Sequence, residues 1–276
     1  ISEIIPVFSR KAIFGYKGIV ISSMAIAVAG SLVWAHHMYT SGMSDVSVFV
    51  FSLLTYLVAI PTAVKVFSWV STMYKGSILM TPPLFMALIF IYLFTVGGLT
   101  GLVLGAAGTD IHVHDTTFVV AHFHFTMFGG TGFAFFAGLH YWWPKMFGIM
   151  YDFKKAYIAS VLATVGFIFH YIPMFILGLQ GMPRRYYDYL PHFETGNFLA
   201  GFGGILMVAG IMLMFINLWA SFRVREPAVS DPWGGTTLEW SVPSPPPLHN
   251  FVEEPKILEY PYDFSGVLAR AAKNKG

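Results

Sequence analysis

The sequence predicts an all-α membrane protein, a bundle of six transmembrane helices. Of its 276 residues, 56% are hydrophobic and only 11% are charged, whereas soluble domains contain roughly 25% charged residues. Apolar runs of the length that crosses a bilayer occur at 18–37, 47–73, 84–107, 117–143, 156–180 and 197–222. These runs lack the period-2 alternation of barrel strands, so helices are expected.

Three regions are expected along the chain. Residues 1–17 are predicted to be the inner-side end of a preceding helix and a loop, 18–223 the six-helix region, and 224–276 a largely irregular tail with a stiff extended piece at 243–247. The chain begins with Ile and has no secretory signal pattern, so we expect it to be part of a longer polypeptide. It contains no cysteine, which leaves imidazole as its strong nitrogen ligand and excludes thiolate metal sites.

Basic residues of the expected loops predict the orientation. They occur before the first helix and after the second, fourth and sixth, namely Arg10, Lys11, Lys17, Lys75, Lys145, Lys154, Lys155, Arg223 and Arg225. The loops 38–46 and 106–116 contain no Lys or Arg. By the positive-inside rule, the basic loops mark the cytoplasmic or matrix side. The net charge of +2 and the absence of a basic and aromatic stripe argue against a nucleic-acid partner.

Arg184 and Arg185 depart from this pattern, since they belong to an outer loop. Adjacent guanidinium groups near a membrane surface indicate a bound anion, because arginine pairs well with carboxylates. A solvated outer loop is the alternative.

His122 and His124 lie inside the fourth apolar run, where ionisable side chains are costly and usually functional. Residues two apart on an α-helix are separated by about 200°, so the two imidazoles point to opposite faces and cannot readily bind one metal. They suit two haems that flank one helix, each bound through one ring nitrogen. The alternative is a polar pair that is hydrogen-bonded inside the bundle.

His36 and His37 end the first run, about 100° apart on a helix, and copper accepts such nitrogen ligands. The alternative is a pair of interfacial histidines beside Trp34 in an aromatic belt. The predicted topology places both at the same outer depth as His122 and His124. Four imidazoles from two helices are therefore expected to meet beneath the outer arginine loop.

His114 and Asp115 precede the fourth helix at the outer surface. A ring nitrogen and a carboxylate oxygen can contribute to a divalent metal site. From these two residues alone, capping of the following helix by Asp115 is the favoured alternative.

Lys65 lies inside the second run, several turns from its outer end. An amine at this depth is costly unless it reaches water, a partner or the neutral state. Thr62 is three residues earlier and therefore on nearly the same face. Together they indicate part of a proton route from the inner side, with a lysine that snorkels to an interface as the alternative.

An ordered set of motifs resembles subunit I of the haem-copper oxygen reductases, in particular the A-type cytochrome c oxidase branch. The motifs are Trp34-Ala-His-His-Met38, Ile60-Pro-Thr-Ala-Val-Lys-Val-Phe-Ser-Trp69, Leu93-Phe-Thr-Val-Gly-Gly-Leu-Thr-Gly101, His114-Asp-Thr followed by Val-Val-Ala-His-Phe-His124, Gly181-Met-Pro-Arg-Arg-Tyr186, and Leu238-Glu-Trp240 with Pro245-Pro-Pro-Leu-His-Asn-Phe251. The resemblance covers nearly the whole chain and implies the second half of a twelve-helix subunit.

The resemblance implies a role for each histidine of the two inner motifs. His36 and His37 would be two ligands of the copper (CuB) at the oxygen-reducing centre. His122 would bind the high-spin haem that faces this copper, and His124 would bind the low-spin haem that delivers electrons. Haem A is the expected type of both.

The resemblance also implies sites outside the haem-copper centre. His114 and Asp115 match ligands of a magnesium or manganese site that a carboxylate of subunit II completes. Arg184 and Arg185 match arginines beside the haem propionates. A further set of positions matches the proton channel named after its lysine, and it consists of Lys65, Thr62 and Ser2.

The activity implied by the resemblance is reduction of O₂ to water, coupled to proton pumping, with cytochrome c as the electron donor. The implied partners are the N-terminal half of subunit I, subunits II and III, cytochrome c and membrane lipid. The implied location is the bacterial inner membrane or the mitochondrial inner membrane.

Two residues depart from the family pattern, since Thr117 stands where tyrosine is expected and His112 adds an imidazole near the outer metal site. The family's third copper histidine and the second axial histidine of its low-spin haem belong to the first half of the subunit, which this sequence does not include. The alternatives are a quinol oxidase or nitric oxide reductase of the same superfamily, and a non-enzymatic transporter half whose histidines line a polar cavity.

Overall fold

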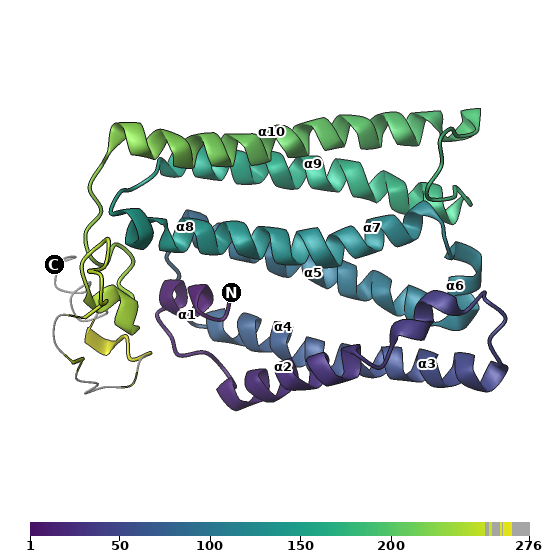
Figure 1. The fold of residues 1–276 in the computed structure, drawn as a ribbon, viewed down its shortest axis with the longest axis horizontal. Helices are drawn as coiled ribbons and strands as arrows, with labels where there is room; N and C mark the ends of the chain where they lie inside the picture. The colour runs from purple at the N-terminus through teal and green to yellow at the C-terminus, as the bar shows by residue number, and fades with distance from the viewer. Residues whose placement is uncertain (252–253, 256–259, 261, 267–276) are drawn as a thin grey trace.

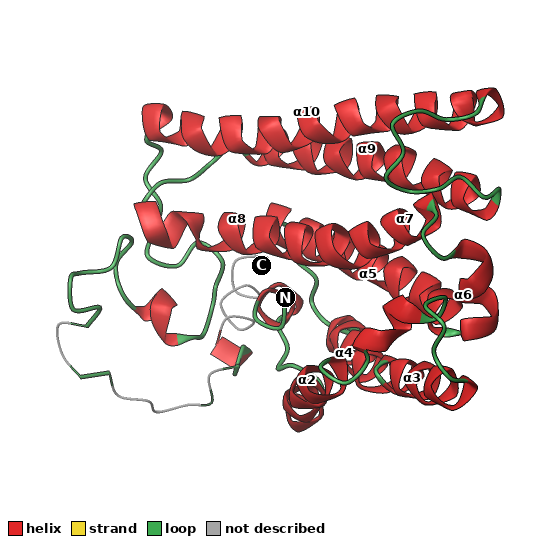
Figure 2. Ribbon diagram, turned by 45° about the vertical axis from the view of Figure 1, so that its right-hand side comes forward, coloured by secondary structure: helices red, strands yellow, loops and turns green. Residues whose placement is uncertain are grey.

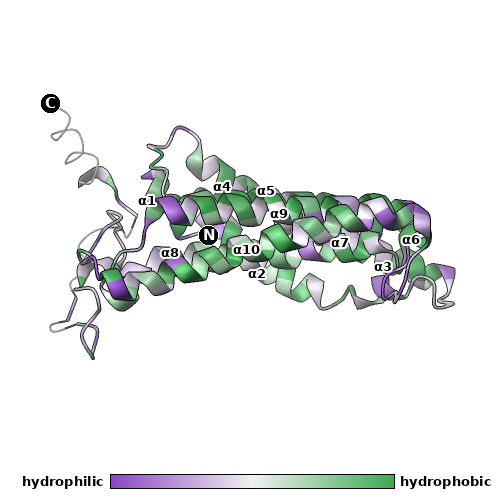
Figure 3. Cartoon of the chain, turned by 90° about the horizontal axis from the view of Figure 1, so that it is seen from above, coloured by the Kyte–Doolittle hydropathy of each residue, from purple (hydrophilic) through white to green (hydrophobic). Residues whose placement is uncertain are grey.

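The computed structural model of the chain describes residues 1–251, 254–255, 260 and 262–266. In this part of the chain, six helical stretches are long and apolar enough to cross a membrane: Tyr16–Met38, Asp45–Met73, Pro82–Gly105, Thr117–Phe147, Phe153–Leu179 and Pro191–Val224. Each overlaps one predicted run, so the predicted all-α membrane fold is confirmed. Apolar residues cover most of the helix surfaces, and hydrophilic residues gather toward the two ends and in the tail (Figure 3).

The first crossing stretch does not remain α-helical to its end. After the short buried helix α1 (Ile4–Ser9), helix α2 (Tyr16–Gly30) is followed by a separate 3₁₀ helix, η1 (Trp34–Met38). His36 and His37 therefore lie on a 3₁₀ turn, not on the α-helix where we expected them. Neighbouring side chains on a 3₁₀ turn are about 120° apart instead of 100°.

The second crossing stretch is divided into α3 (Asp45–Leu57) and α4 (Ala59–Met73). Pro61 has no N–H to donate to the carbonyl of Leu57, which interrupts the hydrogen-bond ladder at this point. The break separates α3 from α4, the part of the stretch that contains Lys65.

Helix α5 (Pro82–Gly105) is followed by α6 (Ala107–Val113), a short helix where we expected only a loop. The fourth stretch consists of α7 (Thr117–Thr126), the π-helical segment η2 (Met127–Gly132) and α8 (Phe133–Phe147). A Cβ on Gly129 would lie 2.8 Å from Cβ of Leu93 in α5. Glycine at this position therefore allows α5 to approach η2 closely.

The last two crossing helices are α9 (Phe153–Leu179) and α10 (Glu194–Val224), which the 3₁₀ helix η3 (Pro191–Phe193) precedes. A Cβ on Gly210 of α10 would overlap the backbone nitrogen of Ala163 in α9, and a Cβ on Gly166 would overlap the backbone of Met207. Glycine at these positions allows the two helix backbones to touch.

The helices form one elongated bundle. In Figure 1, α9 and α10 lie along one side, α2, α3 and α4 along the opposite side, and α5, α7 and α8 between them. Figure 2 shows the same separation after rotation, with the described part of the tail at one end of the bundle and α6 at the other.

The tail is anchored beneath α8 and contains the 3₁₀ helix η4 (Leu238–Ser241). The indole N–H of Trp233 donates to the carbonyl of Tyr141 at 2.8 Å, and that of Trp240 donates to the Tyr141 hydroxyl at 2.9 Å. Lys145 Nζ donates to the carbonyls of Val242 and Ser230 at 2.7 and 2.9 Å. Although irregular, this part of the tail is held in place by buried contacts.

Candidate functional site

A cavity of about 620 Å³ lies between η1, α3, α4, α5 and α7. Five of the six predicted metal ligands line it, namely His36, His37, His114, Asp115 and His122. The remaining lining residues are predominantly apolar. The structure therefore brings together, from two distant parts of the sequence, three of the four imidazoles that we expected to meet.

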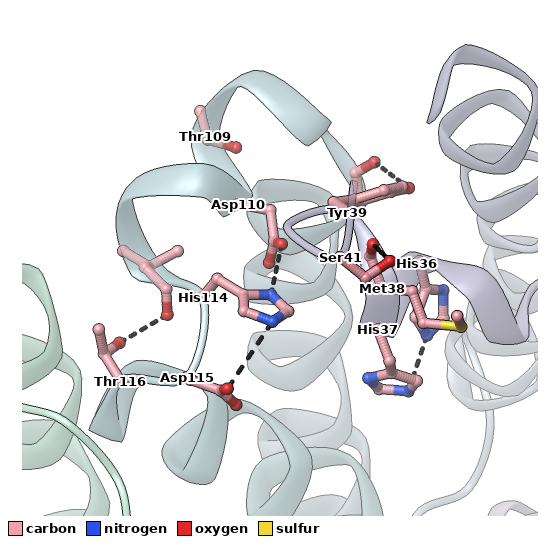
Figure 4. A network of polar contacts seen from close by, with 12 residues as sticks. His36, His37, Met38, Tyr39, Ser41, Thr109, Asp110, His114, Asp115 and Thr116 are labelled. Atoms are coloured by element: carbon pink, nitrogen blue, oxygen red, sulfur yellow. Dashed lines mark hydrogen bonds and ion pairs between the residues drawn. The ribbon is translucent and has the colours of Figure 1, made fainter. Parts of the chain in front are cut away.

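His36 and His37 converge on one point. Their Nε2 atoms are 3.0 Å apart, and Figure 4 shows the two rings side by side at the end of η1. Two nitrogens that bind one metal at about 2 Å each are expected to be about 3 Å apart. The pair therefore has the geometry of two ligands of a single ion.

The Nδ1 atoms of two of these histidines are already engaged by threonine hydroxyls. Thr55 Oγ1 lies 3.1 Å from Nδ1 of His36, and Thr100 Oγ1 lies 3.1 Å from Nδ1 of His122. Each hydroxyl donates its own proton to a helix carbonyl, so it accepts from the ring N–H. This arrangement protonates Nδ1 and leaves Nε2 as the ligand atom.

His124 lies on the other face of α7 and does not line the cavity. Its ring stacks on Tyr171 of α9 with the centroids 4.6 Å apart, and its Nδ1 donates to the carbonyl of Val120 at 2.8 Å. The expectation that four imidazoles meet is thus wrong for His124, because the 200° separation on the helix turns it away. The opposite orientation of His122 and His124 is confirmed.

The residues fit a flat prosthetic group with an imidazole ligand. The cavity is apolar, and its wall is open at Gly98, where a Cβ would meet no atom within 4 Å. At Gly101, a Cβ would lie 3.0 Å from Cε1 of His122, so a larger side chain would crowd the ring. No group of three or more metal-ligating side chains occurs in the described residues, so His36 and His37 provide two side-chain ligands to a metal.

A second polar cluster lies at the C-terminal end of α6. His114 Nδ1 is 2.9 Å from Asp110 Oδ2, and His114 Nε2 is 3.9 Å from Asp115 Oδ2 (Figure 4). The Asp110 contact fixes His114 with Nε2 directed toward Asp115, as in the carboxylate-histidine pairs of metal sites. Burial raises the pKa of Asp110, opposed by its hydrogen bond to His114. His114 and Asp115 can thus contribute one nitrogen and one oxygen to a divalent ion.

Asp115 does not cap α7, so this alternative is wrong. Thr116 is the N-cap residue, and its hydroxyl accepts from the backbone N–H of Phe118. Asp115 has a positive φ of 55° and forms an ion pair with Arg184. That backbone conformation turns its carboxylate toward the arginine loop and His114.

The two outer arginines differ in position. Arg184 lines the cavity, and its Nε is buried without a hydrogen-bond partner in the described structure. Arg185 is exposed, with a φ of 60°. Only Arg184 therefore directs a guanidinium group toward the cavity.

Ser2 and Lys65 both contact Trp69, a residue that sequence reasoning did not single out. The Trp69 indole N–H donates to Ser2 Oγ at 2.8 Å, and Lys65 Nζ lies 5.5 Å from the centroid of the same ring. Thr62 lines the cavity, whereas Lys65 does not. Ser2, just before α1, and Lys65 of α4 are thus linked through Trp69, and Thr62 lies at the cavity wall.

Sequence reasoning also missed the partners of the histidines. Asp110 is four residues before His114, a spacing that brings side chains together on a helix. Its contact with His114 could have been predicted if a helix had been expected at α6. Thr55 and Thr100 gave no such signal, because each is far in sequence from the ring that it contacts.

Comparison with known proteins gives a consistent result. The family model "Cytochrome C and Quinol oxidase polypeptide I" matches residues 1–212. The chain is 44% identical over 259 residues to cytochrome c oxidase subunit 1 of Bacillus sp. (strain PS3), covering 93% of this chain and 42% of the relative. It is 43% identical over 263 residues to cytochrome c oxidase subunit 1 of Thermostichus vulcanus, covering 95% and 48%.

A solved structure is also similar, described as "Cryo-EM structure of a heme-copper terminal oxidase dimer provides insights into its catalytic mechanism". Its TM-score is 0.63 at 26% sequence identity, and the match covers 68% of this chain and 39% of that chain. The chain spans less than half the length of these relatives. The chain belongs to the Cytochrome C and Quinol oxidase polypeptide I family.

Proposed function

We propose that this chain forms the C-terminal part of the catalytic subunit of a terminal respiratory oxidase, which reduces O₂ to water at a haem-copper centre. The observation that carries this proposal is the convergence of His36, His37 and His122 on one apolar cavity. Two of the three rings engage Nδ1 with a threonine hydroxyl, which leaves Nε2 available for a metal.

Each histidine has a proposed role. His36 and His37 would hold the copper, and His122 would provide a ring nitrogen to the high-spin haem in the same cavity. His124, on the opposite face of α7, would provide a ring nitrogen to the low-spin haem. When bound, the haems and the copper supply the electron transfer and oxygen chemistry, which amino-acid side chains do not perform. Haem A is the proposed type.

The surrounding residues position the reacting groups and neutralise charge. The mostly apolar cavity wall would limit the access of water to the bound groups. Arg184 directs a guanidinium group into the cavity, where it would pair with a haem propionate, and Arg185 would act from the exposed side of the loop. His114 and Asp115 would bind magnesium or manganese, with a further carboxylate from subunit II.

Protons are proposed to enter from the inner side past Ser2 and reach the cavity by way of Lys65 and Thr62. The contacts that support this route are those of Trp69 with Ser2 and with Lys65. Proton pumping, electron delivery from cytochrome c through subunit II, and assembly with the N-terminal half of subunit I and with subunit III belong to the same proposal. The proposed location is a bacterial or mitochondrial inner membrane.

The test is a reduced-minus-oxidised optical spectrum, with and without carbon monoxide, combined with metal analysis of the purified complex that carries this chain. His122→Ala should remove the carbon monoxide-sensitive haem, and His124→Ala should remove the low-spin band. His170→Ala is the control, because this intramembrane imidazole donates to the carbonyl of Ala200 and lies outside the cavity.

Unchanged haem signals in both variants would contradict the proposal. A complex with non-haem iron in place of copper would instead indicate a nitric oxide reductase. A protein without haem would be a transporter half.

A further inference from the structure

We propose that Glu3 is a proton-relay carboxylate at the inner end of the route to Lys65, and that the tail of the same chain holds it in place. This inference rests on the proposed function, in which Lys65 carries protons. It adds a residue of this chain, and two tail residues that position it, to that route.

Glu3 lies where a proton from the inner side would enter. It directly follows Ser2 and precedes the buried helix α1, which lies at the same end of the bundle as the tail (Figure 1). Its side chain is half-buried. A half-buried carboxylate can exchange protons with water while remaining next to the interior.

Two hydroxyls of the tail orient the Glu3 carboxylate. Tyr262 donates to Oε2 at 2.7 Å, and Thr237 donates to Oε1 at 3.3 Å. Among the described residues, no Lys or Arg forms an ion pair with Glu3. Neutral donors hold the carboxylate in position without locking it in the charged form, as a cation would.

The electrostatic surroundings favour proton exchange. Burial raises the pKa of Glu3 above its ordinary 4.5, and the nearby Glu239 raises it further, whereas the hydrogen bonds from Tyr262 and Thr237 lower it. The hydroxyl of Tyr141 is the titratable group that faces this cluster from α8. A carboxyl group whose pKa is moved toward neutral pH is suited to accept and release protons.

Ser2 and Trp69 lie between Glu3 and Lys65. Ser2 is its direct neighbour, Trp69 donates to Ser2 Oγ at 2.8 Å, and Lys65 Nζ lies 5.5 Å from the Trp69 ring centroid. The step is a proton transfer: a proton from inner-side water neutralises the Glu3 carboxylate, and the acid then passes it, through the Ser2 hydroxyl or a water molecule, to the neutral amine of Lys65. Glu3 returns to carboxylate as Lys65 becomes an ammonium.

The experiment uses the intact oxidase complex and measures proton uptake with a pH-indicator dye when the metal centre is reduced. Glu3→Gln should slow this uptake about a hundredfold, the lower end of what a positioned proton-transfer group contributes. Glu3→Asp should restore much of the rate. Glu226→Gln is the control, because it removes a carboxylate from the same end of the bundle that lies outside the route, and optical spectra verify assembly of each variant.

Lys65→Met distinguishes a failure of the proposed role of Glu3 from a failure of the proposed lysine route. Slow uptake in Lys65→Met together with normal uptake in Glu3→Gln would overturn the role of Glu3 and leave the lysine route intact. Normal uptake in Lys65→Met would overturn the route itself.

Tyr262→Phe provides a second test that keeps the carboxylate. Loss of the Tyr262 hydrogen bond raises the pKa of Glu3, since this bond lowers it. The pH at which uptake falls to half should therefore move upward, and the carboxyl C=O band of Glu3 in the infrared difference spectrum should titrate at the same higher pH. An unchanged pH profile would overturn the proposal.

Discussion

Thr100 Oγ1 lies 3.1 Å from Nδ1 of His122, while the same hydroxyl is 2.9 Å from the carbonyl of Gly97. Because the hydroxyl donates to the carbonyl, its lone pair accepts from the ring, and Nε2 of His122 is left free toward the cavity. One residue of α5 thus selects the tautomer of a proposed haem ligand on α7.

Thr100→Val should weaken the high-spin haem site without removing its ligand. Loss of a partner that orients a metal-binding histidine typically reduces affinity about ten- to hundredfold. Carbon monoxide difference spectra during dilution or haem competition measure the loss. Thr164→Val is the control, because the Thr164 hydroxyl bonds only to its own helix, at Ser160; equal loss in both variants would contradict the tautomer argument.

Asp110→Asn should weaken the proposed outer magnesium or manganese site. The variant replaces the carboxylate that holds His114 at 2.9 Å by an amide, and loss of such a partner reduces metal affinity about ten- to hundredfold. Manganese electron paramagnetic resonance after growth in manganese reports occupancy. Asp45→Asn, on the outer side at the start of α3, should leave the signal unchanged, and an unchanged signal in Asp110→Asn would argue against this role.

Gly210→Ala should destabilise the α9–α10 pair. The new methyl group would overlap the backbone of Ala163. Overpacking costs about 1–3 kcal/mol of stability, and a loss near the upper end of this range is expected because backbone atoms cannot rotate away. Thermal unfolding of the detergent-solubilised complex measures the change. Gly201→Ala, also in α10 but with no atom within 4 Å of the added Cβ, should leave stability equal or higher.

Lys145→Met should release the tail. Lys145 is 5% exposed, and its ammonium group donates to the carbonyls of Ser230, Val242 and Pro243. Removing it leaves buried carbonyls without a donor, at a cost of about 3 kcal/mol. Limited proteolysis after residue 230 should become faster by about a hundredfold if cleavage follows local opening. Lys154→Met, on the exposed surface, should be cleaved at the wild-type rate.

Glu3 should make the stability of the complex depend on pH. Its folded pKa lies above the ordinary 4.5, so between these two values the folded state keeps a proton that the unfolded state releases. Stability therefore falls as pH rises through this window and stays lower above it. Glu3→Gln should remove this fall in stability. The measurement compares the unfolding midpoints of both proteins below pH 4.5 and near neutral pH. An unaltered pH dependence in the variant would contradict the assignment of a raised pKa to buried Glu3.

Local periodicity and length determined much of this protein. A bilayer sets the length of a crossing helix, so six apolar runs were enough to predict the bundle, and 3.6 residues per turn placed His122 and His124 on opposite faces. The motif order indicated the family, and the comparisons confirmed it. These features depend on residues that are near one another in the chain.

Tertiary structure decided which side chains contact the site residues. These contacts join residues that are far apart in the sequence, at separations that helix periodicity does not predict. Thr100 selects the tautomer of His122 across two helices, Trp69 links Lys65 to Ser2, and Thr237 reaches Glu3 from the far end of the sequence. Long loops can close in many ways at similar entropic cost, so only packing of the whole bundle selects these partners.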